Sequence, residues 1–562
     1  SITADSEILT TVSGELIPFL TIPVQGKGPF QPVWKGPKSE FIDNEILSLL
    51  RKGTIIPSQH EPDEFISPIF LRDKRDGSFR MILNLKTLNE HVQYHHFKME
   101  TIETVISMMT PGCFMASIVL KDPYYCVPIS KEHQKCLKFQ WKGCLYQFTC
   151  YPNGLACCPR KFTKLLKPVY FTLRQAGHLS VGYIDDSYLQ GTDYDQCLEN
   201  IKDTVALFTT LGLLIHPDKS VLYPTQQIVF LGFLLNSVTM TISLPTEKAG
   251  RVKDACAALL HNLSPTIREV SQVLGLLTSS MPGVMYGPIH YRSLDMNKTM
   301  ALQGARGNYN QPMTLSNSGK HDLHWWVNNV ATAYNVVSHG EPVLTMTTDA
   351  SKTGWGCSLH KVPTGGQWTP EEASEHINFL EIKAVLLGLR SFVHKVSSQH
   401  VKVLIDNTTA VSCINHMGTC HSEKLNSIVI EIWEWCILHD VWLTAAHIPG
   451  AVNIIADQES RKISSDLEWA LHINIYTEAV KLCDFTPNID LFASRLNTKC
   501  QHYISYHPDP GAQAVNAFTL SWCGLHFYAF PPCSIILKVL RKIREDKATR
   551  ILVGQLSLGG PT

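Results

Sequence analysis

The 562-residue chain lacks any run of eighteen or more apolar residues, so no membrane-spanning helix is expected. It also lacks a basic segment followed by an apolar stretch at its start, which argues against a secretory signal. These two absences predict an intracellular protein, in the cytoplasm, the nucleus or both. The first residue is Ser and not Met, so we expect a fragment or a processed piece of a longer product.

The chain lacks a dense cysteine framework of the kind that disulfide-rich secreted domains show, because its 17 Cys residues are spread over 562 positions. Reduced thiols are therefore expected. One short stretch places Cys413, His416, Cys420 and His421 at a spacing that could hold zinc. The alternative is an ordinary helix and the loop after it, and we favour this second interpretation.

The chain has no excess of charge of either sign. Lys plus Arg and Asp plus Glu both number 49, which gives a formal net charge of zero. This excludes a general polycation but not a nucleic-acid groove, because a groove needs only local positive charge. Basic residues do gather in two places, although a solvated helix face is an alternative for the second: Arg72, Lys74, Arg75 and Arg80, then Arg160, Lys161, Lys164 and Lys167.

The length and the 44% hydrophobic content predict three or four globular domains. Periodicity in the first 245 residues predicts an α+β unit. Its expected elements are a helix over 38–53, two strands and a helical start within 66–92 with a turn at Asp76–Gly77, a strand running into a helix over 114–130, a strand, turn and long helix over 145–175, a hairpin over 179–191, a helix over 194–213 and short strands near 228–237.

The second half predicts a separate α/β domain, because a pair of strands is followed by alternating helices and strands. A helix over 264–280 and a polar, Gly/Asn-rich linker over 300–320 precede it. Its expected elements are two strands within 343–359, a helix over 379–395, a strand over 401–405, helices over 408–416 and 422–438, and a strand over 441–447.

The tetrapeptide 183-YIDD-186 puts two acids at a tight turn between apolar strands, where a divalent cation would relieve their repulsion. An ordinary turn with two acids is the alternative. The surrounding stretches decide between them: SPIFLRDKRDGSFRMILNLKTLN, SIVLKDPYYCVPI, YPNGLACCPRKFTK, YIDD and FLGFLL follow each other in this order. Over residues 60–240, the chain resembles the fingers and palm of a retroelement reverse transcriptase.

The resemblance implies a role for each matching position. Asp185 and Asp186 would hold catalytic magnesium, and Arg80 and Lys74 would contact the incoming triphosphate. Tyr124 would be the steric gate against a ribose 2′-OH. The turn that contains Asn153 would cradle the base pair and template, and FLGFLL would grip the primer.

Three positions depart from that family. Val119 stands where the family has a metal-bridging Asp, and valine has no lone pair to give. Pro123 stands where the family has a backbone N–H that touches the triphosphate. Asn153 stands where members carry Gln or Phe. We therefore expect a kept polymerase fold with impaired RNA-directed DNA polymerase activity.

A second set of acids lies in TTDASKTGWG, FLEIKAV, LIDNTTAV and AHIPGAVNIIADQESR, which resemble retroelement ribonuclease H. Converging carboxylates from distant elements are what a two-magnesium phosphodiesterase needs, and four solvated acids are the alternative. The implied metal ligands are Asp349, Glu381, Asp406 and Asp457, with His447 assisting product release.

The region 485–543 resembles the C-terminal part of DIRS-type retrotransposon polyproteins, which has been likened to an adenine-N6 DNA methyltransferase. Enzymes of that class hold the flipped amino group with a polar-Pro-Pro-aromatic loop. The corresponding loop here is Phe530-Pro531-Pro532-Cys533, which has neither the polar first residue nor the final aromatic ring. We expect structural packing and no methyl transfer.

Over about residues 60–545, the chain resembles a DIRS-type retrotransposon polyprotein. This resemblance implies an α+β and α/β multidomain fold, with a right-hand polymerase, a ribonuclease H-like domain and a small C-terminal unit. The expected boundaries are 1–60, 61–245, 246–340 (thumb or connection), 341–465 and 466–562. The expected reaction is Mg²⁺-dependent hydrolysis of RNA in RNA–DNA hybrids, with Mn²⁺ as a substitute, and the ancestral partners are a primed RNA template and deoxynucleoside triphosphates. A non-catalytic nucleic-acid-binding remnant or a domesticated protein is the alternative, and the sequence leaves the oligomeric state open.

Overall fold

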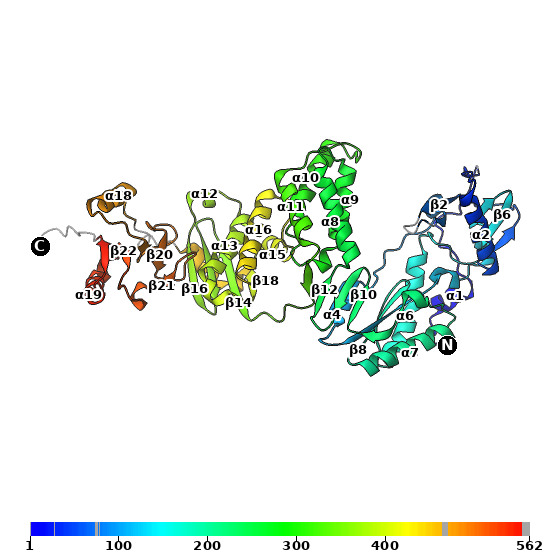
Figure 1. Cartoon of the computed structure of the whole chain (residues 1–562), viewed down its shortest axis with the longest axis horizontal. Helices are drawn as coiled ribbons and strands as arrows, with labels where there is room; N and C mark the ends of the chain where they lie inside the picture. Colours follow the sequence, from blue (N-terminus) through cyan, green and yellow to red (C-terminus); the bar gives the residue numbers. More distant parts are fainter. Residues whose placement is uncertain (1, 27, 74–76, 78, 463–469, 554–562) are drawn as a thin grey trace. The chain divides into compact units, whose positions relative to one another are not determined.

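The computed structural model describes residues 2–26, 28–73, 77, 79–462 and 470–553. The chain divides into two compact units, one made of Ser1–Lys248 with Tyr334–Val337 and the other of Ala249–Ala333 with Ser338–Thr562. Figure 1 labels their helices and strands. Within the described ranges, no helix has both the length and the apolar character needed to cross a bilayer.

The first unit is built on a four-stranded sheet in the order β7-β8-β4-β9. Tyr170 of α6 bonds Ser187, and Gly191 approaches the backbone of Cys197 in α7. Because Ser187 and Gly191 point the same way along β8, α6 and α7 cover one face of the sheet. The elements are β4 (Phe114–Val119), β7 (Leu179–Tyr183), β8 (Asp186–Gly191), β9 (Val221–Thr225), α6 (Cys158–Gln175) and α7 (Tyr194–Thr210). The expected hairpin and long helices are confirmed.

The first unit also contains a three-stranded sheet in the order β1-β6-β5 and the hairpin β2–β3. In the sequence, β1, β2 and β3 precede β4, whereas β5 and β6 lie between β4 and β7. The expected strand pair around Gly77 is confirmed, while Asp76 lies outside the described residues. The elements are α1 (Ser6–Gly14), α2 (Pro37–Arg51), β1 (Ile55–Ser58), β2 (Ile69–Asp73), β3 (Phe79–Leu83), α3 (Lys86–Asn89), α4 (Ile102–Met108), α5 (Lys131–Gln134), β5 (Lys138–Trp141) and β6 (Cys144–Phe148).

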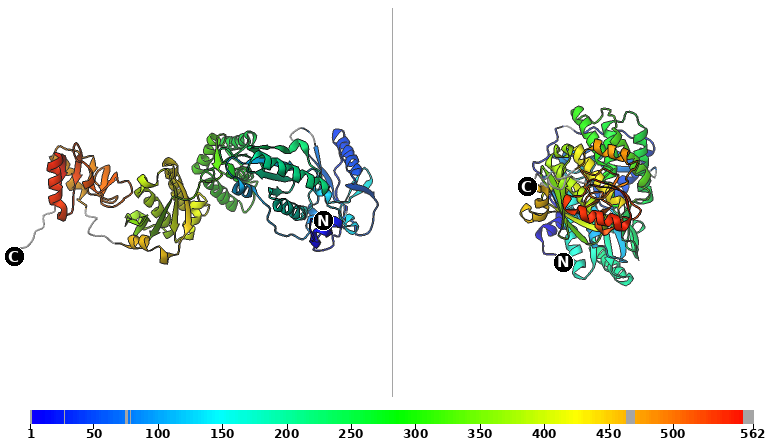
Figure 2. Two further views of the ribbon diagram at one scale, coloured as in Figure 1. Left: turned by 90° about the horizontal axis from the view of Figure 1, so that it is seen from below. Right: turned by 90° about the vertical axis from the view of Figure 1, so that its left-hand side faces the viewer.

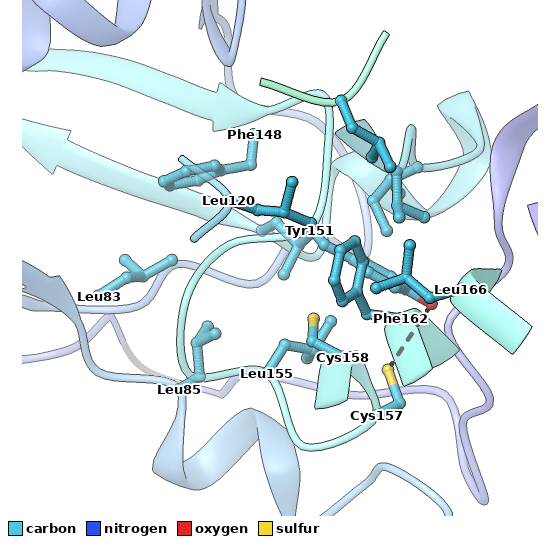
Figure 3. Packing of buried hydrophobic residues seen from close by; sticks show 14 of the residues in the cluster. Leu83, Leu85, Leu120, Phe148, Tyr151, Leu155, Cys157, Cys158, Phe162 and Leu166 are labelled. Carbon is cyan, nitrogen blue, oxygen red and sulfur yellow. Dashed lines mark hydrogen bonds between the residues drawn. The ribbon is translucent and has the colours of Figure 1, made fainter. Parts of the chain in front are cut away.

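One hydrophobic core holds these sheets and α6 together. Figure 3 shows Leu120, which follows β4, close to Tyr151, Cys158 and Phe162. The side chains of Tyr151 and Cys157 also form a hydrogen bond across the turn. This packing fixes the 151–157 turn against the end of β4, where the candidate polymerase site begins.

A further sheet in the order β10-β11-β12-β13 closes the first unit, and four helices open the second. The expected linker over 300–320 is wrong, because α10 continues to Gly304, α11 begins at Asn317, and buried Leu294 and Leu323 belong to these two helices. The prediction failed because a polar connection between two packed helices has the same amino-acid composition as a linker between domains. The elements are β10 (Gln227–Phe230), β11 (Phe233–Asn236), β12 (Thr241–Ser243), β13 (Tyr334–Val336), α8 (Thr246–His261), α9 (Ile267–Thr278), α10 (Arg292–Gly304) and α11 (Asn317–Asn329).

The α/β domain contains a five-stranded sheet in the order β16-β15-β14-β17-β18, with β14, β17 and β18 parallel. Gly356 of β15 faces α17 and the next residue, Cys357, faces α13, so these helices cover opposite faces of the sheet. Figure 1 labels α13, β14, β16 and β18 of this domain, and Figure 2 gives two further views. The elements are β14 (Leu344–Ala350), β15 (Gly354–Leu359), β16 (Val362–Gln367), α12 (Pro370–Ala373), α13 (Ile377–Ser391), α14 (Val393–Val396), β17 (His400–Ile405), α15 (Thr408–Asn415), α16 (Glu423–Leu438), β18 (Trp442–His447) and α17 (Ile454–Arg461).

The C-terminal region is a parallel sheet in the order β21-β20-β19-β22-β23. Its core contains Trp522, Phe527 and Val539, so the region folds as a packed unit of its own. The elements are α18 (Ile473–Leu482), β19 (Ile489–Asp490), β20 (His502–Ser505), β21 (Ala514–Val515), β22 (His526–Ala529), α19 (Ile536–Asp546) and β23 (Thr549–Leu552). The domain boundaries expected from the sequence remain predictions.

Candidate active sites

The first candidate site lies at the β7–β8 hairpin. Tyr183 and Asp186 pair across it, and Ile184 and Asp185 form its tip. Ile184 has a φ of 54°, a left-handed conformation that β-branched residues rarely adopt. The backbone N–H of Leu120 donates to the carbonyl of Asp185 at 2.8 Å, so the tip is tied to the end of β4.

Burial and charge repulsion both disfavour the ionised form of Asp186 in this hairpin. Burial and the charge of the neighbouring Asp185 together raise the pKa of Asp186 to about 6, against the opposing effect of Lys219. Lys219 ends a short turn at Pro217–Lys219 and was not predicted as a site residue. A Lys close to the two acids would have identified it as a site residue. However, the fold and not the local sequence brings Lys219 close to Asp186.

Val119 is the last residue of β4 and lies opposite Asp186. Its backbone is fixed on both sides, because its N–H donates to Ser220 Oγ at 2.9 Å and its carbonyl accepts from His216 at 2.8 Å. The structure therefore places a hydrocarbon side chain beside the paired acids. A carboxylate at this position would face the same site.

The residues expected to bind nucleotide lie on several elements. Tyr124 packs edge-on against Phe162 with ring centres 5.6 Å apart, and burial raises the pKa of its hydroxyl. Pro123 opens the turn Pro123–Cys126, immediately after Asp122, whose φ is 51°. The remaining three are Arg80, exposed on β3, Asn153, which bonds the side chain of Tyr125, and Lys74, which lies outside the described residues.

The second candidate site is a group of three carboxylates from three separate elements. Asp349 lies near the end of β14, and Asp406 follows β17, which runs parallel to it, so both acids emerge at one edge of the sheet. Glu381 comes from α13, on one face of that sheet. Carboxylate oxygens of these three residues all lie within 4.8 Å of one another.

Burial makes the ionised form of these three carboxylates unfavourable unless a positive charge lies close to them. Glu381 is only 4% exposed, and its Oε2 has no hydrogen-bond partner among the described residues. Burial, together with the charges of Asp349 and Asp406, raises the pKa of Glu381 to about 8. Burial also raises the pKa of Asp349. Oxygen ligands at this separation, one of them unpaired, fit a hard divalent cation such as Mg²⁺.

The fourth acid and the histidine lie at the periphery of this group. Asp457 on α17 is not one of the three clustered acids, and its Oδ1 accepts from Arg461 Nη2 at 2.7 Å. An exposed pair of this kind contributes little to stability, so it would compete only weakly with a metal ion. His447 ends β18 beside Ile405 and is exposed, close in sequence to the loop where Gly450 approaches Asp406.

Zinc binding at the Cys413–His421 stretch finds no support in the part of the chain that the structure describes. There, the only cluster of potential metal ligands is the three-acid group. Cys413 is buried at the end of α15, and Cys420 accepts a long hydrogen bond from Arg292 Nη1 at 3.7 Å. The helix-and-loop interpretation of this stretch agrees with these contacts.

In the C-terminal unit, the Phe530–Cys533 loop follows β22, and Asp490 ends the neighbouring strand β19. Asp490 is buried, and it accepts from the N–H groups of Phe492 and Lys499. Burial raises its pKa to about 6. The carboxylate is thus already engaged by the loop that follows its own strand.

Comparisons with known proteins agree with this architecture. Residues 72–235 match the family model described as "Reverse transcriptase (RNA-dependent DNA polymerase)". The chain is similar to the transposon Tf2-3 and Tf2-7 polyproteins of Schizosaccharomyces pombe (strain 972 / ATCC 24843), at 21% and 20% identity over 449 residues, which cover 75% of this chain and 31% of each relative. It therefore spans about a third of the length of the curated relatives it matches.

Among solved structures, the foamy viral protease-reverse transcriptase in complex with dsDNA shares the fold, with a TM-score of 0.50 and 17% identity over 78% of this chain and 88% of that one. The expected multidomain class, a polymerase fold followed by a ribonuclease H-like domain, is confirmed. The assignment to the DIRS type stays a prediction. Residues 72–235 match a reverse transcriptase domain, and the chain is similar in sequence to Tf2 retrotransposon polyproteins.

Proposed function

We propose that residues 341–465 hydrolyse the RNA strand of RNA–DNA hybrids in a magnesium-dependent reaction. The observation that carries this proposal is the buried group of Asp349, Glu381 and Asp406, whose oxygens lie within 4.8 Å of one another. Acids brought together from two strand ends and a helix have no structural use that would offset their repulsion. A bound divalent cation would offset it.

These three side chains would hold the metal, and Asp457 would contribute to a second position. When bound, magnesium activates the attacking water and stabilises the leaving oxygen. The buried Glu381 would then be ionised by its bond to the cation. His447, exposed at the end of β18, would assist departure of the product.

For the first unit, we propose an ancestral RNA-directed DNA polymerase that is impaired in this chain. Val119 leaves Asp185 and Asp186 without the third carboxylate, and Pro123 has no N–H for the triphosphate. The partners would be a primed RNA template and deoxynucleoside triphosphates. These two positions also favour the second candidate function, a unit that binds nucleic acid without extending it.

Hydrolysis is tested with the full chain, an RNA–DNA hybrid labelled on the RNA strand, and Mg²⁺ or Mn²⁺. We expect cleavage of the RNA strand only, and a loss of about a hundredfold or more in Asp406→Asn, which equals about 2.7 kcal/mol of transition-state stabilisation. Asp440→Asn is the matched control, because Asp440 is exposed before β18, at the opposite end of that strand from His447. A folded wild-type chain without metal-dependent cleavage would refute the proposal.

A further inference from the structure

A buried hydroxyl contacts the three-acid group from the side of α17. Ser460, which is 1% exposed, donates from its Oγ to Asp349 Oδ2 at 2.6 Å. The same Oγ lies 2.9 Å from the carbonyl of Asp457, one turn earlier in the helix. A hydroxyl has a single proton, and the shorter contact to a carboxylate is the stronger of the two.

The fold holds Ser460 in this position through its backbone. A Cβ on Gly356 would lie 2.6 Å from the N of Ser460 and 2.0 Å from the carbonyl of Ala456, so glycine lets α17 lie directly on β15. In addition, Ser351 Oγ donates to the carbonyl of Ser460 at 2.6 Å. Contacts from the β14–β15 hairpin to the N and the carbonyl of Ser460 therefore hold its hydroxyl beside Asp349.

The hydrogen bond constrains the acid that receives it. With Oδ2 engaged by Ser460, the carboxylate of Asp349 can no longer rotate freely about its terminal bond. Its free lone pairs then keep a fixed direction relative to Glu381 and Asp406.

We propose that Ser460 is a positioning residue that orients Asp349 for a divalent metal ion, an inference that rests on the proposed function of this site. Hydrogen-bond partners of metal ligands contribute a factor of about 10 to 100 to metal affinity. The competing interpretation is a helix serine that only bonds its own backbone at Asp457. If Ser460 orients Asp349, removing its hydroxyl weakens metal binding. If it only bonds its own backbone, removing the hydroxyl leaves metal binding unchanged.

The test measures Mn²⁺ binding to the full chain without nucleic acid, by electron paramagnetic resonance of the free ion and by calorimetry. For Ser460→Ala we expect binding weakened about tenfold or more. Ser460→Thr keeps the hydroxyl and should restore binding to within about threefold of the unmodified chain. Ser358→Ala is the matched control, because Ser358 is a buried serine of β15.

Circular dichroism and melting curves check that each variant is folded. If Ser460→Ala does not fold, Ser460→Cys keeps the size of the side chain, has only a weak donor, and should show the same weakened binding. Unchanged Mn²⁺ affinity in a folded Ala or Cys variant overturns the inference, and so does a wild-type chain that binds no Mn²⁺. Wild-type binding without hybrid cleavage refutes the proposed hydrolysis alone, because the comparison of affinities still decides the role of Ser460.

Discussion

Val119 and Asp186 lie directly opposite each other on the antiparallel strands β4 and β8. Ser187, the next residue of β8, points to Tyr170 of α6, so Asp186 and its partner Val119 point to the other face of the sheet. Opposed residues on one face have Cβ atoms about 5 Å apart. A carboxylate at position 119 would therefore lie within reach of a metal ion held by Asp186.

Restoring that carboxylate should restore part of the polymerase reaction. We expect Val119→Asp to raise primer extension slightly, and Val119→Asp with Pro123→Ala to raise it by about tenfold or more over the unmodified chain. The two changes act on one complex, so their effects should not be independent. The measurement is nucleotide incorporation on a primed RNA template, with Mg²⁺ and with Mn²⁺.

Val119→Asn is the control for this series, because it has nearly the shape of Asp without the charge. Robust extension by the unmodified chain would show that position 119 does not matter. A folded double variant that stays inactive would show that the impairment extends further, with Asn153 the next position to revert.

Glu381 should make the metal-free chain less stable as the pH rises. Its pKa is about 8 in the folded protein against an ordinary 4.5, so the folded state binds more protons than the unfolded state between these values. Stability therefore falls from about pH 5 to pH 8, and Glu381→Gln should remove this loss, on the order of 2 kcal/mol. Hydrogen exchange of β17 in a chelator, at pH 6 and pH 8, measures it.

Mg²⁺ should oppose the same loss in the unmodified chain and have little effect in Glu381→Gln, because the cation favours the ionised carboxylate. Asp440→Asn changes an exposed acid of the same domain and should leave the pH dependence unaltered. Equal protection of β17 at both pH values in the metal-free wild type, after correction for intrinsic exchange, would contradict the prediction.

Gly356→Ala should disable the candidate hydrolase site without changing any acid. The added Cβ would lie 2.0 Å from the carbonyl of Ala456, so α17 must move away from β15 and take Asp457 and Ser460 with it. We expect cleavage to fall by about a hundredfold and the domain to lose about 2 kcal/mol or more of stability.

The control for this change is Gly275→Ala in α9. A Cβ there would meet nothing within 4 Å, and alanine is the better helix former by about 1 kcal/mol, so stability should rise slightly. Denaturant unfolding and hybrid cleavage measure both variants. Wild-type cleavage by Gly356→Ala would mean that α17 does not need its close approach to β15.

The C-terminal unit should not bind S-adenosylmethionine, although its five strands form a parallel sheet. Asp490, at the end of β19, already accepts two backbone N–H groups, and the loop after β22 begins with Phe530 instead of a polar acceptor. Calorimetry of the full chain with the cofactor measures this. A micromolar dissociation constant would make the unit a methyltransferase candidate.

Some features follow from local sequence alone. The alternation around 183-YIDD-186 predicts the β7–β8 hairpin, and the helical spacing after Pro37 predicts α2, because each depends on residues a few positions apart. The same holds for the strands and helices that were expected between residues 343 and 447, a set that does not include β16. The motif around Val119 resembles that of reverse transcriptases, and this resemblance alone predicts that an acid would be expected at position 119.

Other features depend on contacts between residues far apart in the chain, which no local pattern encodes. The three acids meet only because β14 pairs in parallel with β17 and α13 packs over them. Strand β16 was missed because its Pro363, Gly365 and Gly366 read as a loop, yet pairing with β15 holds it extended. In the sequence, nothing distinguishes Ser460 from any other serine in a helix. Only the packing of α17 on Gly356 brings its hydroxyl to Asp349.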